Sequence, residues 1–284
     1  MSTKIEVVAP GPFATVQDLG RPGLASLGVG RSGAADRSSL RLGNRLAGNP
    51  EGNAAIEATL GGLVIRFSEP ALIAVTGAVC EIRVGGRAAG MFAPIQVRSG
   101  EEVKLSVPSQ GLRTYLAVRG GIDVTPVLHA RATDTLAKLG PPALSAGMTL
   151  PIGARVAGYP VVDLAPQKAF PEELVLRVTP GPRLDWFVPG TMTTLTTTSY
   201  EVTANADRVG LRLSGPELTR CQDGELAPEA CVPGALQVPP SGVPILFLVD
   251  HPVTGGYPVV AVVDDAGIDL AAQARPGRRI RFTR

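Results

Sequence analysis

The sequence predicts a mostly β fold made of two related halves, with only a few short helices. Short runs of alternating apolar and polar residues recur along the chain, and glycine (34 residues) and proline (26 residues) fall between them, as in strands joined by tight turns. The second half repeats motifs of the first half in the same order, which indicates an internal duplication. With 284 residues, 44% of them hydrophobic, the chain can bury a substantial core.

The strands are predicted by a period of two, which gives each run one apolar and one polar face. The clearest runs are residues 81–84, 103–107, 113–118, 174–178, 211–213 and 279–282. The most apolar stretch, residues 243–249, is interrupted by Pro244 and is much shorter than the ~20 residues of a membrane-spanning helix. We therefore expect a buried strand there.

Three short helices are expected between the strands. Glycine is favoured just beyond the C-terminus of a helix, and proline cannot continue one. The predicted helices, each with the residue that closes it, are 36–46 (Gly48), 133–139 (Gly140) and 265–274 (Pro276).

The internal repeat has a nearly constant offset. Pro10 and Pro180 begin matching Pro-Gly-Pro motifs 170 residues apart, and Asp36 and Asp207 begin matching Asp-Arg pairs 171 residues apart. Chance matching among glycine and proline turns is the alternative, because such turns recur in any β protein. We predict a first domain in residues 1–168, which includes an inserted segment at about 111–168 and a linker, and a second domain in residues 169–284. Strand exchange between the two is left open.

The composition excludes several classes of partner. Lys and Arg number 27 against 25 Asp and Glu, so the net charge of +2 is too weak to predict binding to nucleic acid or to a membrane. The first nine residues contain no apolar core of a signal peptide, and we expect a cytoplasmic protein. Cys80, Cys221 and Cys231 have no Cys-x-x-Cys spacing, so we expect three small buried side chains and neither a disulfide framework nor a zinc site.

Several common cofactor motifs are absent. Residues 28–33 fit G-x-G-x-x-G, but no strand–helix–strand unit surrounds them, which favours a turn or a substrate-lining loop over a dinucleotide site. None of the four lysines follows a glycine, which excludes a Walker-type phosphate loop, and none lies between methionines, so no covalent biotin is expected on this chain. His129 and His251 are the only histidines, and no metal site is predicted.

A group of polar residues in glycine-rich turns forms the candidate site. Arginine presents a planar fork of donors that fits a carboxylate, phosphate or carbamate, and aspartates can orient an amide or accept a proton. We expect Asp18, Asp36 and Tyr257 to be catalytic. The expected substrate- or anion-binding residues are Arg21, Arg37, Arg208, Gln237, Thr254, Gly255 and Gly256. The alternative is that the Asp36–Arg37 and Asp207–Arg208 pairs form internal salt bridges that fix turns.

Six longer motifs occur in an order that is typical of one protein family. They are residues 10–23 (PGPFATVQDLGRPG), 32–36 (SGAAD), 117–123 (AVRGGID), 207–213 (DRVGLRL), 233–240 (PGALQVPP) and 254–258 (TGGYP). By these motifs nearly the whole chain resembles the biotin-dependent carboxyltransferase-like family. That family includes KipA proteins, the C subunit of bacterial ATP-dependent 5-oxoprolinase, proteins called allophanate hydrolase subunit 2, and part of the carboxyltransferase region of urea carboxylase. Residues 128–133 and Val259 depart from the usual family pattern.

The resemblance implies two cyclophilin-like β-barrel domains and a role in a multi-subunit hydrolase. The chain would be the C subunit of an ATP-dependent 5-oxoprolinase, inactive alone, in which ATP with Mg²⁺ activates 5-oxo-L-proline for ring opening to L-glutamate. The implied partners are a KipI-like B subunit, which shares the catalytic cleft, and a LamB/YcsF-like A subunit. The implied substrate is a small amide or lactam.

Two other functions fit the same motifs. A carboxyltransferase subunit of a biotin-dependent urea or amide carboxylase would take its carboxyl group from a separate biotin carrier. A KipA-type regulator would bind and antagonise a KipI-like kinase inhibitor without turning over any amide. We expect the 5-oxoprolinase role because the chain has a stand-alone length and lacks a biotin-carrier lysine.

Overall fold

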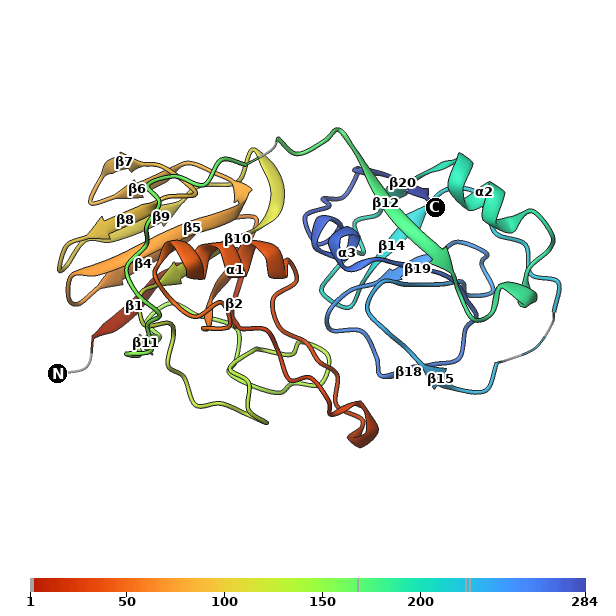
Figure 1. Ribbon diagram of the computed structural model, residues 1–284, viewed down its shortest axis with the longest axis horizontal. Coiled ribbons are helices and arrows are strands. Elements are labelled where there is room, and N and C mark those ends of the chain that lie inside the picture. Colours follow the sequence, from red (N-terminus) through yellow and green to blue (C-terminus); the bar gives the residue numbers. More distant parts are fainter. Residues whose placement is uncertain (1–2, 168, 223, 225) are drawn as a thin grey trace. The chain divides into compact units, whose positions relative to one another are not determined.

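The computed structural model describes residues 3–167, 169–222, 224 and 226–284 and divides into two compact units. The first unit consists of Met1–Arg21, Asp36–Asp134 and Lys138–Phe170, and the second of Pro22–Ala35, Thr135–Ala137 and Pro171–Arg284. Two segments from the first half of the sequence therefore belong to the second unit. In Figure 1 the strands of the first unit are red to yellow, and the barrel strands of the second are green to blue.

The first unit contains two antiparallel sheets around one apolar core. The six-stranded sheet has the order β11 (Thr149–Pro151), β1 (Lys4–Pro10), β4 (Leu63–Phe67), β9 (Glu102–Leu105), β6 (Ile82–Val84) and β7 (Arg87–Ala89). The five-stranded sheet has the order β2 (Phe13–Gln17), β3 (Ala55–Thr59), β10 (Gln110–Val118), β5 (Ala71–Val79) and β8 (Pro94–Val97). Ile5 and Phe67 from one sheet and Ile56 and Leu116 from the other share a buried cluster, as expected when alternate side chains of each strand face inward.

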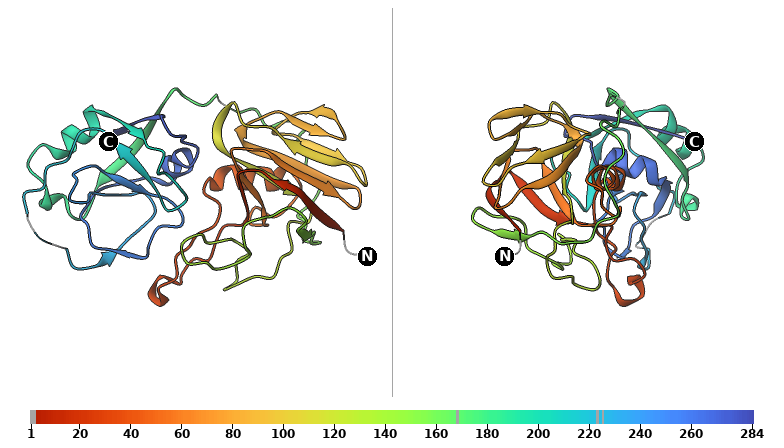
Figure 2. Two further views of the ribbon diagram at one scale, coloured as in Figure 1. Left: turned by 180° about the vertical axis from the view of Figure 1, so that it is seen from behind. Right: turned by 60° about the vertical axis from the view of Figure 1, so that its left-hand side comes forward.

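Helix α1 (Arg37–Leu46) packs against β5 and β10 of the five-stranded sheet (Figures 1 and 2). The carboxylate of Asp36 caps its N-terminus by accepting a hydrogen bond from the backbone N–H of Ser39 at 2.9 Å. The Thr76 hydroxyl donates to the Ser39 carbonyl at 2.7 Å, which fixes the first turn on the sheet. The sequence prediction of a helix over residues 36–46 is confirmed.

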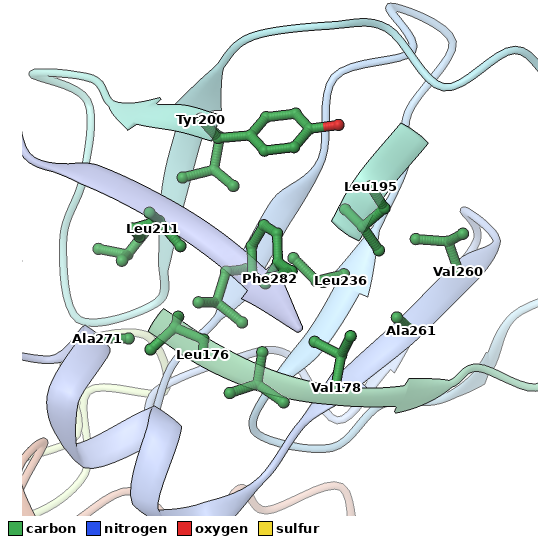
Figure 3. Close-up of a cluster of buried hydrophobic side chains, with 14 of the residues drawn as sticks. Leu176, Val178, Leu195, Tyr200, Leu211, Leu236, Val260, Ala261, Ala271 and Phe282 are labelled. Carbon is green, nitrogen blue, oxygen red and sulfur yellow. The ribbon is translucent and has the colours of Figure 1, made fainter. Parts of the chain in front are cut away.

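The second unit is a closed barrel. Its strands run in the order β12 (Glu173–Pro180), β19 (Val259–Val263), β16 (Ala235–Gln237), β17 (Ile245–Phe247), β14 (Gly210–Ser214), β13 (Ser199–Val202) and β20 (Arg279–Thr283). β12 closes the barrel because it pairs antiparallel with β19 and parallel with β20. Figure 3 shows the core, in which the rings of Tyr200 and Phe282 lie 5.7 Å apart beside Leu176 and Leu236. The short strands β15 (Glu229–Ala230) and β18 (Thr254–Gly255) form a separate ribbon.

Two helices of the second unit differ from the sequence prediction. Helix α3 (Asp265–Ala271) is present but ends before residue 274. Helix α2 (Thr191–Thr197) was not predicted, because threonine has a low helix propensity. Its apolar side chains Met192 and Leu195 are buried in the barrel core, while the hydroxyls of Thr196 and Thr197 donate to carbonyls one turn earlier. Packing therefore outweighs propensity in this segment.

The helix predicted at residues 133–139 is wrong. Backbone groups of this segment bond to other parts of their own units, since the Thr133 carbonyl accepts from the Gln17 amide at 2.9 Å and the Thr135 N–H donates to Asp250 at 3.0 Å. Lys138 has a φ of 57°, which ends any right-handed helix. A turn at residues 135–137 replaces the expected helix.

The mostly β fold with few short helices is confirmed, and so are all six strand predictions, whose runs overlap β6, β9, β10, β12, β14 and β20. The expected strand at residues 243–249 is present in its central part as β17. The first unit has two separate sheets where a barrel was expected. The cyclophilin-like relationship, the duplication and the boundary at residues 168/169 stay predictions, and Lys168 itself lies outside the described residues.

The expectation of three buried cysteines is wrong for Cys221, whose side chain is exposed; Cys80 and Cys231 are half-buried. Cys221 follows a β-bridge between Phe187 and Arg220 at the surface of the second unit. Within the described part of the chain, no helix has the length and apolar character needed to span a bilayer.

Candidate functional site

The predicted site residues are divided between the two units. Asp18, Arg21, Asp36 and Arg37 belong to the first unit. Arg208, Gln237, Thr254, Gly255, Gly256 and Tyr257 belong to the second. Their geometry is described unit by unit.

The first unit contains a small polar cavity of about 180 Å³. Four charged side chains and one amide lie on its wall, together with backbone from three glycine-containing turns. The lining residues are Asp18, Gly52, Asn53, Ala54, Gly120, Gly121, Ile122, Asp123, Arg131, Gly153, Ala154 and Arg155. The volume is below the ~300–1,000 Å³ of cofactor and drug-sized pockets, so the cavity suits a compact ligand.

Asp18 is the predicted catalytic residue that lies on this cavity. It follows strand β2, and its residue surface is 8% exposed. One carboxylate oxygen accepts from the Gly20 N–H at 2.8 Å and the other from the Arg131 N–H at 2.6 Å. Burial raises the pKa of the Asp18 carboxyl, although these two amides and the nearby arginines lower it. Asp18 can therefore gain or lose a proton more readily near neutral pH than an exposed aspartate.

Three further polar side chains of the cavity come from distant parts of the sequence. The Arg131 guanidinium donates to Asp123 at 2.6 Å through Nη2. Its buried Nε–H has no hydrogen-bond acceptor within the part of the chain that the structure describes. The Asn53 amide donates to the Arg155 carbonyl at 2.7 Å, which fixes the backbone beside the exposed Arg155 side chain.

Close backbone contact explains the glycine pair at the base of the cavity. Gly120 has a φ of 95°, and a Cβ there would lie 2.0 Å from the Gly153 carbonyl oxygen. Gly121 has a φ of 76°, and its Cβ would lie 3.0 Å from Asn53. Only glycine fits both requirements, so the Arg-Gly-Gly motif serves the shape of the cavity wall.

Arg21 is held inside the first unit and does not line the cavity. Its guanidinium donates to the Ala132 carbonyl at 2.6 Å and lies 4.0 Å from the Asp134 carboxylate. It is 2% exposed. These contacts hold the 127–134 segment that carries Arg131, which gives Arg21 a structural reason to be present. Its predicted anion-binding role stays a prediction.

Asp36 has a defined structural role as the N-cap of α1. Its backbone N–H donates to the Tyr115 hydroxyl at 2.8 Å, and that hydroxyl donates to Glu57 at 2.7 Å. Burial, together with the charges of Glu57 and Asp36, raises the pKa of Tyr115 well above its usual range. Arg37 is the first residue of the helix. The catalytic role of Asp36 and the binding role of Arg37 stay predictions.

In the second unit, Arg208 belongs to a buried network centred on Asp250. Arg208 Nε donates to Asp250 at 2.9 Å, and its Nη2 donates to the Gly33 carbonyl at 2.6 Å. The hydroxyls of Ser32 and Thr135 each donate to Asp250 at 2.6 Å. Burial by itself would raise the pKa of Asp250, but Arg208 and the two hydroxyls outweigh it and lower that pKa. The network anchors both inserted segments, 22–35 and 135–137, on the barrel.

The remaining predicted residues meet at one turn of the second unit. The Gln237 side-chain amide donates to the Tyr257 carbonyl at 3.0 Å. A Cβ at Gly255 would lie 2.5 Å from that amide nitrogen and 3.0 Å from Cys231 Sγ, so the residue must be small. Thr254 pairs with Ala230 in the β15–β18 ribbon, and the Tyr257 side chain is 43% exposed.

The sequence interpretation missed the residues that complete both constellations: Asn53, Asp123, Arg131, Arg155, Thr135 and Asp250. Asp250 carried a usable signal, because it directly follows the apolar run 243–249, at the end of a buried strand. Asp123 was visible within the Arg-Gly-Gly-Ile-Asp motif. Asn53, Arg131 and Arg155 lie in ordinary turns, and only the fold brings them together.

A family model described as "Carboxyltransferase domain, subdomain A and B" matches residues 27–284. The chain belongs to this carboxyltransferase family. It is 34% identical over 281 residues to the C subunit of 5-oxoprolinase from Escherichia coli (strain K12), covering 98% of this chain and 90% of that protein. It is 33% identical over 305 residues to the urea amidolyase of Lachancea kluyveri, covering 98% of this chain and 17% of that protein.

Solved structures of the carboxyltransferase family have the same fold. The crystal structure of TTHA0988 matches with a TM-score of 0.90 at 35% identity and covers 100% of this chain. The Kluyveromyces lactis urea carboxylase matches with a TM-score of 0.93 at 29% identity and covers 98% of this chain. The chain spans 56% of the length of TTHA0988 and 27% of that of the urea carboxylase, so both contain further regions.

Proposed function

We propose that this chain is the C subunit of an ATP-dependent 5-oxoprolinase, a hydrolase that opens 5-oxo-L-proline to L-glutamate. The observation that carries the proposal is the match to the corresponding 5-oxoprolinase protein of Escherichia coli, because it spans 98% of this chain and 90% of that one. A second protein of the same name, from Haemophilus influenzae, is 35% identical over 272 residues. The small polar cavity of the first unit is compatible with a compact lactam.

The proposed reaction assigns limited chemistry to this chain. A lactam carbonyl is a poor electrophile, so its oxygen must gain a leaving group before water can open the ring. Asp18 would orient the lactam amide or a water molecule, since its carboxylate is fixed by two backbone N–H groups at the cavity wall. Arginine side chains on the same wall would hold the substrate. Completion of the site would require a KipI-like B subunit and a LamB/YcsF-like A subunit, and the isolated chain would be inactive.

ATP does not fit the groups found on this chain. The sequence has no Gly-Lys-Ser/Thr phosphate loop, and the polar cavity, at about 180 Å³, is smaller than pockets that hold ligands of cofactor size. Among the described residues there is also no cluster of three His, Cys, Asp or Glu side chains for a metal ion. We therefore assign the binding of ATP and Mg²⁺ to surfaces completed by the partner subunits, and no nucleotide step to residues of this chain alone.

A second candidate function is a carboxyltransferase subunit of a urea or amide carboxylase. It is favoured by the match to the urea amidolyase of Lachancea kluyveri over 98% of this chain. In that case the carboxyl group would arrive on a biotin carried by another polypeptide. Capture of a biotinylated protein by the purified chain, together with urea-dependent loss of carboxybiotin, would favour this alternative over the first proposal.

Co-expression with the two partner subunits tests the proposal. We expect 5-oxoproline-dependent release of ADP by the three-subunit complex and none by any one of the three polypeptides in isolation. Asp18→Asn should lower kcat, whereas Arg212→Gln, an exposed change on β14, should leave turnover unchanged. A complex that forms but releases no ADP above the rate of its partners by themselves would exclude the 5-oxoprolinase function.

A further inference from the structure

The charges on the polar cavity of the first unit are unequally occupied. Asp123 is paired with Arg131 at 2.6 Å, and the two oxygens of Asp18 are taken up by the N–H groups of Gly20 and Arg131. Arg155 is the remaining charged group on the wall, and it has no ion pair within the described residues. The cavity therefore offers one uncompensated positive charge.

Arg131 adds a directed donor to that charge. Its Nη2 is bonded to Asp123, but its buried Nε–H lacks an acceptor among the residues the structure describes. A buried donor without an acceptor is unfavourable, and arginine presents Nε–H and an Nη–H as a fork that matches a carboxylate. An anionic oxygen in the cavity would satisfy this donor.

The state of Asp18 strengthens the same preference. Because burial raises the pKa of this carboxyl, it gives up its charge more easily than Asp123, and each step toward the neutral form makes the wall more positive. A neutral Asp18 would also present an O–H donor to a ligand carbonyl. The small volume limits the ligand to a compact molecule.

We propose that this cavity is a binding site for a compact monocarboxylate, with Arg155 and the Nε–H of Arg131 as the groups that select the carboxylate. In the 5-oxoprolinase this ligand would be the substrate itself, so the identity of the natural ligand rests on the proposed function. The carboxylate site does not, because it follows from the charges and the open donor. The cavity selects against a neutral amide such as urea, which lacks the anionic group.

Calorimetric titration of the purified full chain with three matched probes tests this. The probes are 5-oxo-L-proline, 2-pyrrolidinone, which is the same ring without the carboxylate, and cyclopentanecarboxylate, which keeps the carboxylate but loses the lactam. We expect both carboxylates to bind and 2-pyrrolidinone to bind at least about tenfold more weakly, because a charge-assisted hydrogen bond contributes more than one decade of affinity.

Variants locate the site. Arg155→Gln should weaken carboxylate binding about tenfold or more, Arg155→Lys should retain part of it as a point charge, and Arg131→Lys should weaken it by removing the forked Nε–H. The matched control Arg212→Gln removes an exposed arginine from β14 of the second unit and should leave Kd within about twofold. Circular dichroism of each variant separates lost binding from lost folding.

The outcomes separate this inference from the proposed function. If cyclopentanecarboxylate binds in an Arg155-dependent way while the three-subunit complex does not turn over 5-oxoproline, the carboxylate site stands and the 5-oxoprolinase function fails. If the complex turns over 5-oxoproline but Arg155→Gln leaves both Kd and KM within about twofold, the function stands and the site assignment fails. Absence of binding by either carboxylate, or equal binding of 2-pyrrolidinone, also overturns the inference.

Discussion

A single carboxylate, that of Asp250, accepts hydrogen bonds from Arg208, Ser32 and Thr135 in the second unit. Asp250→Ala would leave the Arg208 guanidinium buried at 4% exposure with no counter-charge. Removing one partner of a buried ion pair costs about 3–5 kcal/mol. We expect a loss of this size in the free energy of unfolding, measured by urea denaturation with barrel fluorescence as the signal.

The pH dependence of that loss gives an internal check. Since the folded-state pKa of Asp250 lies below its ordinary value of 3.8, its contribution is fully present above pH 3.8 and disappears as the pH falls through the lower folded value. The stability difference between wild type and Asp250→Ala should therefore be constant at neutral pH and shrink only in strong acid. The control is Arg87→Gln, which breaks an exposed pair with Glu101 and should change stability far less. A similar loss in both variants would contradict the assigned role.

Thiol reactivity separates Cys80 from Cys221. Burial raises the pKa of the Cys80 thiol to about 11, so at pH 8 only about one thiol in a thousand is the reactive thiolate. The Cys221 side chain is exposed. We expect iodoacetamide to alkylate Cys221 long before Cys80, as followed by peptide mass spectrometry. In urea the difference should vanish, and rapid alkylation of Cys80 in the folded protein would contradict its placement.

At the scale of single residues, the sequence was a partial guide to the candidate site. Asp18 could be selected because it lies in a glycine-rich turn after an apolar strand. Arg131 and Arg155 could not, since their importance depends on Asp123 and Asn53, which are distant in sequence and become neighbours only when the sheets form. Residue type predicts possible chemistry, whereas the availability of a donor such as the Arg131 Nε–H is a property of the folded chain.

The N-terminus of helix α1 allows the two roles considered for Asp36 to be separated. Asp36→Ala removes the acceptor for the Ser39 N–H and should destabilise the protein by about 1 kcal/mol, measured by urea denaturation. Asp36→Ser keeps a capping oxygen and should retain most of that stability. Turnover of the three-subunit complex with Asp36→Ser distinguishes the roles, because retained activity excludes a catalytic carboxylate and abolished activity requires one.

The turn at Leu128 and His129 is conformationally unfavourable. Both residues have positive φ, 51° and 66°, between the paired residues Val127 and Ala130. Replacement by Asn-Gly, the pair preferred in type I′ turns, should stabilise the protein by about 1 kcal/mol, detected as a higher urea midpoint. Ser145→Gly, at an exposed position outside the positive-φ set, is the control and should lower stability. A lower midpoint for the Asn-Gly variant would show that the turn has another constraint.

Elements were predictable where local signals agree with packing. The α1 helix has an N-cap, an apolar face and a terminal glycine in one segment. The α2 helix lacks such local signals and depends on Met192 and Leu195 reaching the barrel core. Residues 133–139 have helical periodicity, but the hydrogen bonds of Thr133 and Thr135 to distant groups take the place of a helix.

At the scale of the whole molecule, the two halves of the sequence are not the two units in space. A periodic pattern and an internal repeat indicate domains that follow one another along the chain, but segments 22–35 and 135–137 belong to the second unit. Nothing local marks this crossing, because the contacts that decide it involve Asp250 and Arg208, which are distant in sequence from both segments. The first unit also lacks the closing strand pair that makes the second a barrel.

A fragment comprising residues 171–284 tests this division. It contains Arg208 and Asp250 but lacks Ser32, Gly33 and Thr135, so Asp250 loses two hydroxyl donors and Arg208 loses a carbonyl acceptor. We expect the fragment to unfold at a lower urea concentration than the same barrel within the full chain. The full chain with Ser32→Ala and Thr135→Ala should show part of the same loss, and an undiminished midpoint for the fragment would contradict the role of the two segments.

The parallel pairing of β12 with β20 also constrains how the protein is made. Leu174 is in register with Ile280, so the first strand of the barrel must wait on the ribosome for the last one to be synthesised. Until then β12 exposes an unpaired edge, which is the kind of surface that other nascent chains can join. Slow translation or truncation before Arg279 would therefore leave the barrel open, and chaperones that shield strand edges would matter most for this part of the chain.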